Sequence, residues 1–218
     1  MRTHQRWRQA CQALSVTQIV YEILPSFVLG FHGCDADVAE QVFAGKADLK
    51  ASVNDYDWLG HGIYFWENNP PGRAMQYAKE LVLHPERCRS AISKPAVVGA
   101  VIDLGICMNL LDAAFLQLLE DGYQSLGKVM KENGQPMPQN TPIGRSRDLL
   151  LRKLDCAVIE WMHVMREREN RTPFDSVRGV FVEGEPLYPN AGFHKHNHIQ
   201  LCVRNPSCIK GYFRVRPD

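Results

Sequence analysis

Two glycine-flanked ring motifs constrain this chain more than any other feature. Gly30-Phe31-His32-Gly33 ends a short apolar run, and Gly60-His61-Gly62-Ile63-Tyr64-Phe65 follows further along the sequence. Glycine has no Cβ, so it allows another segment or a ligand to approach the backbone closely. Histidine offers a hydrogen-bond donor and an acceptor, and tyrosine offers a flat aromatic face with a polar tip. This pattern at strand ends predicts the lining of a pocket and not a hydrophobic core.

Composition indicates one soluble globular domain. The chain has 218 residues, 45% hydrophobic and 22% charged, which is ordinary for such a domain. A formal net charge of +1 gives no case for a general polyanion binder. No apolar run approaches the roughly 20 residues of a membrane span, and the polar N-terminus lacks a signal-peptide core. We therefore expect a cytoplasmic protein with no membrane contact.

The seven cysteines also indicate a cytoplasmic protein. Their number is odd and no Cys-x-x-Cys occurs, which predicts reduced, mostly buried thiols in a cytosol. They are Cys11, Cys34, Cys88, Cys107, Cys156, Cys202 and Cys208.

Short strands and helices follow each other in mixed order. Strands are expected at 27–30, 62–66, 96–104, 177–182, 199–203 and 211–215. Helices are expected at 35–45, from 70 onward, at 110–126 and at 146–165, with loops at 46–59, 133–145 and 190–197. This order favours an α+β fold over a doubly wound sheet. We expect an N-terminal helical arm over 1–24 and a main domain over 25–218 with a helical insertion around 105–170.

The two motifs, together with the downstream Arg73-Ala74-x-x-Tyr77-Ala78, resemble the catalytic domain of the poly(ADP-ribose) polymerase and diphtheria-toxin branch of ADP-ribosyltransferases. In that branch a His-Gly pair ends the first strand of the site. A Gly-x-Gly-Ile-Tyr-Phe stretch begins the next strand, and a helix with Ala and Tyr follows. The resemblance covers about 26–103 and 176–216. It implies a split mixed or antiparallel sheet with flanking helices, and NAD as the substrate without a metal.

The resemblance also implies roles for single residues. His32 would bind the adenosine-side ribose of NAD, the backbone of Gly33 would hold the nicotinamide carboxamide, and Tyr64 would stack on the nicotinamide ring. Breaking the glycosidic bond requires a firmly held dinucleotide more than a strong base. Further candidates around the donor pocket, with Lys50 or Ser52 near the phosphates, are Lys50, Ser52, Asn54, Asp57, Trp58, Gly62 and Tyr77. Trp66 and Glu67 are weaker candidates, and Glu67 could instead cap the next helix.

The third family position departs from the pattern. The family has Glu at the start of a late strand, where this chain most closely offers Gln200. Glutamine keeps a hydrogen bond to a ribose hydroxyl but loses a negative charge, which costs about 1–3 kcal/mol against a developing cation. It also cannot act as a general base, so single transfer is expected and polymer growth is not. His198 and Glu183 are the fallback candidates for this position.

The expected activity is mono-ADP-ribosylation of a protein, RNA or DNA acceptor. Family members of this size in bacteria often act as toxins in defence or toxin–antitoxin systems, restrained by an antitoxin or chaperone. Basic residues expected beside the Gln200 strand favour nucleic acid slightly; they are Arg204, Lys210, Arg214 and Arg216. An NAD glycohydrolase and a non-catalytic NAD or ADP-ribose binding module are the alternatives.

Other site classes find less support. No Walker loop, Gly-x-Gly-x-x-Gly fingerprint or Gly-x-Ser-x-Gly elbow occurs. His194, His196 and His198 alternate with a period of two, so three imidazoles could share a strand face and bind zinc. Because no carboxylate or cysteine partner is fixed nearby, a polar loop beside the pocket is the preferred interpretation.

Overall fold

The protein folds around one mixed β-sheet. The computed structural model describes residues 27–68, 70–85, 91–143 and 148–216. Seven strands form a sheet in the order β4-β7-β8-β2-β1-β3-β9, and β5 and β6 form a small second sheet. Four α-helices accompany them in the described ranges. The predicted α+β class is confirmed, whereas the helical arm predicted for 1–24 lies outside the described residues.

The elements have these bounds. The strands are β1 (Phe27–Asp35), β2 (Ile63–Glu67), β3 (Pro95–Asp103), β4 (Cys107–Asn109), β5 (Asn140–Thr141), β6 (Leu151–Arg152), β7 (Ser176–Phe181), β8 (His198–Val203) and β9 (Ile209–Arg214). The α-helices are α2 (Ala36–Phe43), α3 (Met75–Leu83), α4 (Ala113–Glu132) and α5 (Lys153–Arg168). A π-helical turn over Pro70–Ala74 leads into α3, and a short 3-10 turn covers Pro206–Cys208.

Local sequence explains how the first strand turns into the first helix. The Asp35 side chain accepts a hydrogen bond from the Asp37 N–H, which caps α2 as expected. The same carboxylate accepts from the backbone N–H groups of Ser93 and Lys94, and these bonds hold the pKa of Asp35 well below its usual value. Gly45 follows the helix with a φ of 65°, a conformation that glycine adopts without strain.

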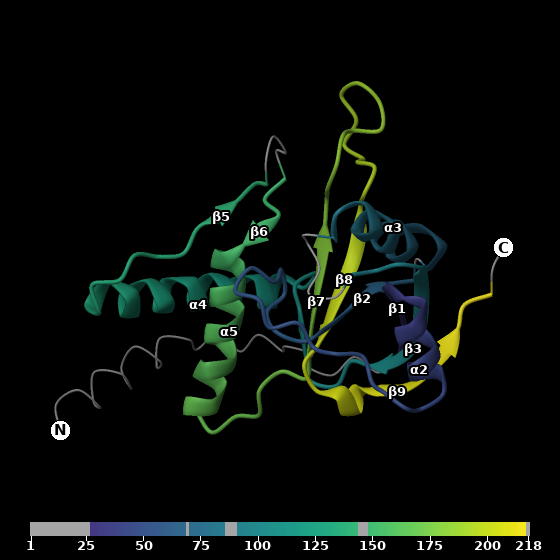
Figure 1. Cartoon of the computed structure of the whole chain (residues 1–218). Coiled ribbons are helices and arrows are strands. Elements are labelled where there is room, and N and C mark those ends of the chain that lie inside the picture. The colour runs from purple at the N-terminus through teal and green to yellow at the C-terminus, as the bar shows by residue number, and fades with distance from the viewer. Residues whose placement is uncertain (1–26, 69, 86–90, 144–147, 217–218) are drawn as a thin grey trace.

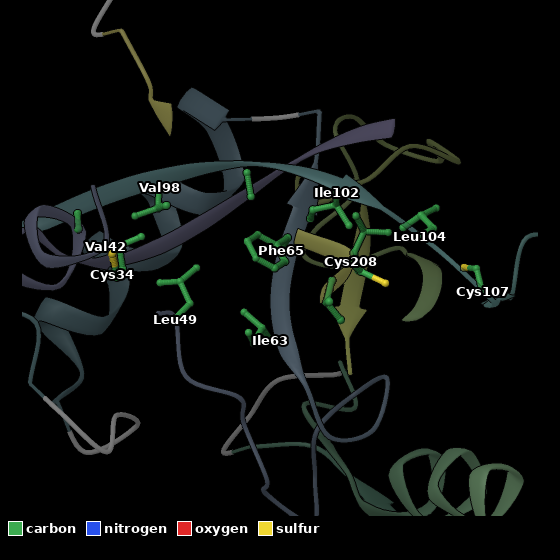
Figure 2. Close-up of a cluster of buried hydrophobic side chains, with 14 residues drawn as sticks. Cys34, Val42, Leu49, Ile63, Phe65, Val98, Ile102, Leu104, Cys107 and Cys208 are labelled. Atoms are coloured by element: carbon green, nitrogen blue, oxygen red, sulfur yellow. The ribbon is translucent and has the colours of Figure 1, made fainter. Parts of the chain in front are cut away.

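The main hydrophobic core lies on one face of the sheet under α2. The apolar run of β3 supplies Val98, Ala100 and Ile102, none of which has any exposed surface. Ile63 and Phe65 of β2, which β1 separates from β3, belong to the same cluster, shown in Figure 2. Five cysteines of the described ranges are buried and carry free thiols, as predicted. They are Cys34, Cys107, Cys156, Cys202 and Cys208.

The centre of the sheet divides into two halves. β1 and β2 are paired only at Gly30↔Glu67 and Phe31↔Trp66. Beyond Phe31, β1 continues along β3 and β2 continues along β8. The two central strands therefore separate at the residue that precedes His32.

The segment expected as a helical insertion is partly built into the sheet. β4 pairs in parallel with β7 and forms one edge of the main sheet. The helices α4 and α5 then pack on each other, on the side of the molecule away from β9 (Figure 1). The helix expected at 146–165 begins only at Lys153, because Leu151 and Arg152 pair with β5. No helix of the described ranges combines the length and apolarity needed to cross a membrane.

Candidate functional site

A cavity of about 600 Å³ opens where β1 and β2 separate. His32 from β1 and Tyr64 from β2 both line it, so the two rings share one cavity. Gly33 follows the lining residue His32 in the chain and is not itself a lining residue. The other sequence-predicted residues that line the cavity are Lys50, Ser52, Asn54, Asp57, Trp58, Gly62, Trp66, Tyr77 and Gln200, together with the fallback candidates Glu183 and His198.

His32 bridges the two separating strands. Its Nδ1 lies 2.8 Å from the Tyr64 backbone oxygen. A carbonyl oxygen can only accept, so Nδ1 carries the hydrogen and Nε2 of the neutral ring is an acceptor. Burial lowers the pKa of His32, although the bond to Tyr64 opposes this. The ring is therefore neutral at pH 7, and its orientation is fixed.

The pleat directs the backbone of Gly33 into the opening. The Ala36 N–H bonds the Lys94 oxygen in the β1–β3 register. In an antiparallel pair the bonded positions alternate, so Gly33, three residues earlier, turns its N–H and C=O away from β3. On that side β2 has diverged, and His32 already occupies the Tyr64 oxygen. A Cβ on Gly33 would lie 2.2 Å from the Ala74 oxygen, so only glycine fits there.

The Tyr64 hydroxyl has a structural partner on each side. It donates to the Gly60 oxygen at 2.6 Å and accepts from the Leu59 N–H at 2.8 Å. Burial raises the pKa of Tyr64 well above its usual value, so the phenol stays neutral. The hydroxyl thus fixes the 59–60 turn, in which Gly60 has a φ of 76°. Because the hydroxyl is engaged by the backbone, the aromatic face of Tyr64 is the part of the side chain that can contact a ligand.

The polar residues of the loop before β2 form hydrogen bonds mainly with protein groups near the cavity. The buried Asp57 carboxylate accepts from the Ser52 hydroxyl at 3.0 Å and from the Asn54 N–H at 2.9 Å. The Trp58 indole donates to the Leu150 oxygen at 2.9 Å, and the Arg152 guanidinium lies 4.3 Å from its ring centroid. These contacts shape one wall of the cavity.

Gln200 lies within the cavity on the same face as Tyr64. It is opposite Trp66 in the β2–β8 register, two positions from Tyr64↔Cys202, and residues two apart on a strand share a face. Its Oε1 and the Trp66 Nε1 are both buried without a hydrogen-bond partner among the described residues. Both residues line the cavity, and each carries a buried polar atom that has no described partner.

The structure adds polar residues that the sequence interpretation ranked low or missed. Arg73 belongs to the quoted motif but received no role, and it lies against Glu183 with Nη2 and Oε2 3.3 Å apart. Its Nη1 lies 3.5 Å from Glu80 Oε1. His198 Nδ1 donates to the His196 oxygen at 2.8 Å, and burial lowers the pKa of His198 to about 4. Asp148 also lines the cavity, and no spacing in the sequence pointed to it.

The structure differs from two alternatives that the sequence left open. Among the described residues Glu67 neither lines the cavity nor caps a helix; its carboxylate accepts two bonds of 2.6 and 2.8 Å from Arg178 on β7. The three histidines do not share one face toward a metal, since His194 faces the Gly184 oxygen and His196 faces Gln76. Within the described ranges no three His, Cys, Asp or Glu side chains come together as a metal site.

The basic residues expected beside Gln200 are also dispersed. Lys210 and Arg214 lie on β9, with β2, β1 and β3 between that strand and β8. Arg204 follows β8, but it pairs with Glu160 at 2.7 Å. The prediction that Lys210 and Arg214 lie beside the Gln200 strand is therefore wrong. Closeness in sequence does not determine which strands are neighbours in a sheet.

Comparisons with known proteins give one distant relative. The chain is similar to an uncharacterized protein of Methanocaldococcus jannaschii, with 27% identity over 198 residues that cover 83% of each chain. No family model and no solved structure matches the chain.

Proposed function

We propose that this protein is a mono-ADP-ribosyltransferase that cleaves NAD, releases nicotinamide and transfers ADP-ribose to a protein or nucleic-acid acceptor. The observation that carries the proposal is the cavity that His32 and Tyr64 share, with Gly33 next to it in the chain, at the separation of β1 and β2. A volume of about 600 Å³ falls in the range of small-molecule pockets, roughly 300–1,000 Å³.

Each of these residues has a chemical task in the proposed reaction. The Gly33 N–H and C=O form the donor–acceptor pair that a carboxamide requires, and the Tyr64 ring supplies a flat surface beside it. His32 turns its unprotonated Nε2 toward the ribose hydroxyls. Together they hold the dinucleotide so that the pyridine can leave and the ribose carbon is exposed to an acceptor.

Gln200 limits what the site can do. Its amide can orient a ribose hydroxyl, but it brings no negative charge to the developing cation and cannot take a proton. This supports transfer of a single ADP-ribose unit. It also keeps a non-catalytic NAD-binding module as the second candidate, while hydrolysis of NAD by water would use the same cavity.

One assay separates these functions. NAD labelled in the adenylate phosphate is incubated with the protein and a cell lysate, and nicotinamide release and macromolecular label are both measured. We expect both, and we expect His32→Ala to abolish them. Label that survives protease but not nuclease identifies a nucleic-acid acceptor, and the reverse identifies a protein. Nicotinamide release without label would indicate a glycohydrolase, and binding without release a non-catalytic module. Equal turnover by His32→Ala would refute the proposed site.

A further inference from the structure

The proposed transfer leaves one proton without a residue to accept it. When an acceptor X–H attacks C1′ of the nicotinamide ribose, the new X–C1′ bond forms and the C1′–N bond breaks. The electron pair of that bond leaves with neutral nicotinamide, and the proton on X must go to a base. Gln200, at the position where the family carries a carboxylate, is an amide and does not accept a proton at neutral pH.

Four carboxylates line the cavity within the described ranges: Asp57, Glu80, Asp148 and Glu183. Asp57 is occupied by the Ser52 and Asn54 donors of its own loop. Asp148 Oδ2 accepts the Gly184 N–H at 3.0 Å. The Glu80 side chain is 39% exposed, so solvent screens it from the reacting centre. Glu183 differs from these three because it is 5% exposed and its carboxylate accepts no backbone N–H within the described ranges.

Glu183 lies close to Gln200 along the cavity wall. His198 precedes Gln200 by two positions on β8, so the two side chains share one face of the sheet. His198 Nδ1 lies 3.5 Å from Glu183 Oε2, and Arg73 Nη2 lies 3.3 Å from the same oxygen. Both contacts use Oε2, and no hydrogen bond within the described ranges engages Oε1.

The surroundings suit a base. Burial raises the pKa of Glu183, while the Arg73 guanidinium opposes that rise. A carboxylate with a raised pKa is a stronger proton acceptor, and the neighbouring cation keeps it ionised near neutral pH. The adjacent His198 stays neutral because burial lowers its pKa to about 4, so it does not compete for the proton under these conditions.

We propose that Glu183, held by Arg73 on the segment after β7, takes the proton from the acceptor nucleophile, while Gln200 orients the ribose from β8. This inference rests on the proposed transferase function. It divides the two tasks of a single family glutamate between β8 and the segment after β7. Gln200 keeps the hydrogen bond, and Glu183 supplies the negative charge and the base. The acceptor group then enters at the end of the cavity formed by His198, Arg73 and Glu183.

The test compares Glu183→Gln with Glu185→Gln in the full chain. Both substitutions remove one carboxylate from the same hairpin, but Glu185 is exposed and does not line the cavity. Total nicotinamide release from NAD in the presence of lysate is measured from pH 5 to 9, and the Kd for NAD is measured by calorimetry. We expect Glu183→Gln to lower the rate by about 10²–10⁴-fold, with a Kd within about threefold of wild type. Its rate should also lose the rise with pH that ionisation of the base produces.

Each outcome decides something. Undiminished release by Glu183→Gln beside an active wild type would overturn the role of Glu183 and leave the transferase proposal intact. An equal loss of rate and NAD affinity would also overturn it, because Glu183 would then serve binding or folding. Absence of release by the wild type would contradict the proposed function itself, and this inference with it. Glu185→Gln should match wild type in both measurements.

Discussion

Replacing Tyr64 with phenylalanine separates the structural task of its hydroxyl from the ligand-facing task of its ring. The hydroxyl accepts the Leu59 N–H and donates to the Gly60 oxygen, and Leu59 is only 1% exposed. Tyr64→Phe leaves both backbone groups without this partner, and an orphaned buried group costs about 1–3 kcal/mol. The Cys202 thiol keeps a weak contact of 3.5 Å with the Gly60 oxygen. We therefore expect the free energy of unfolding to fall by about 2–4 kcal/mol.

Thermal and urea unfolding measure this loss. One kcal/mol shifts Tm by about 2–4 °C in a domain of this size, so Tm should fall by at least about 4 °C. Tyr188→Phe is the matched control, because Tyr188 is 58% exposed. The aromatic ring is retained in Tyr64→Phe, so the Kd for NAD should change by less than about fivefold below the new Tm. A loss below about 0.5 kcal/mol would refute the structural role assigned to this hydroxyl.

Three further changes test other parts of the structure. Gly33→Ala places a Cβ 2.2 Å from the Ala74 oxygen, so we expect lower stability and no NAD binding by calorimetry. Burial lowers the pKa of His163 to about 3, so the unfolded chain takes up a proton that the folded one does not. Stability should fall by about 1.4 kcal/mol per unit as pH drops from 6.5 toward 3; His163→Leu should flatten this slope in denaturant titrations. Glu67→Ala removes the carboxylate partner of the partly buried Arg178 guanidinium and should cost about 1.5–3 kcal/mol, whereas an unchanged urea midpoint would contradict that pair's importance.

Local signals predicted the parts of the fold that depend on neighbouring residues. The Asp35 cap, the apolar run of β3 and the strand around Tyr64 all follow from side-chain type and spacing. The glycine-flanked rings pointed to residues that do meet in one cavity. In each case the information lies within a few positions of the chain.

Long-range pairing was not predictable in this way. The edge position of β9, which separates Lys210 from β8, depends on strand order across the whole sheet. The partner of Glu67 is Arg178, which is distant in sequence and carries no local signature. Asp148 reaches the cavity because the segment before α5 folds against it. Charge-pair and cavity partners of this kind are fixed by tertiary packing, which a single sequence does not display.

The most direct test of the account is a crystal structure with carba-NAD, in which the scissile bond cannot break. We expect the pyridine ring on the Tyr64 face, its carboxamide bonded to the Gly33 N–H and C=O, and a ribose hydroxyl bonded to His32 Nε2. A dinucleotide bound elsewhere, or a cavity between β1 and β2 left empty at saturating carba-NAD, would contradict the central claim.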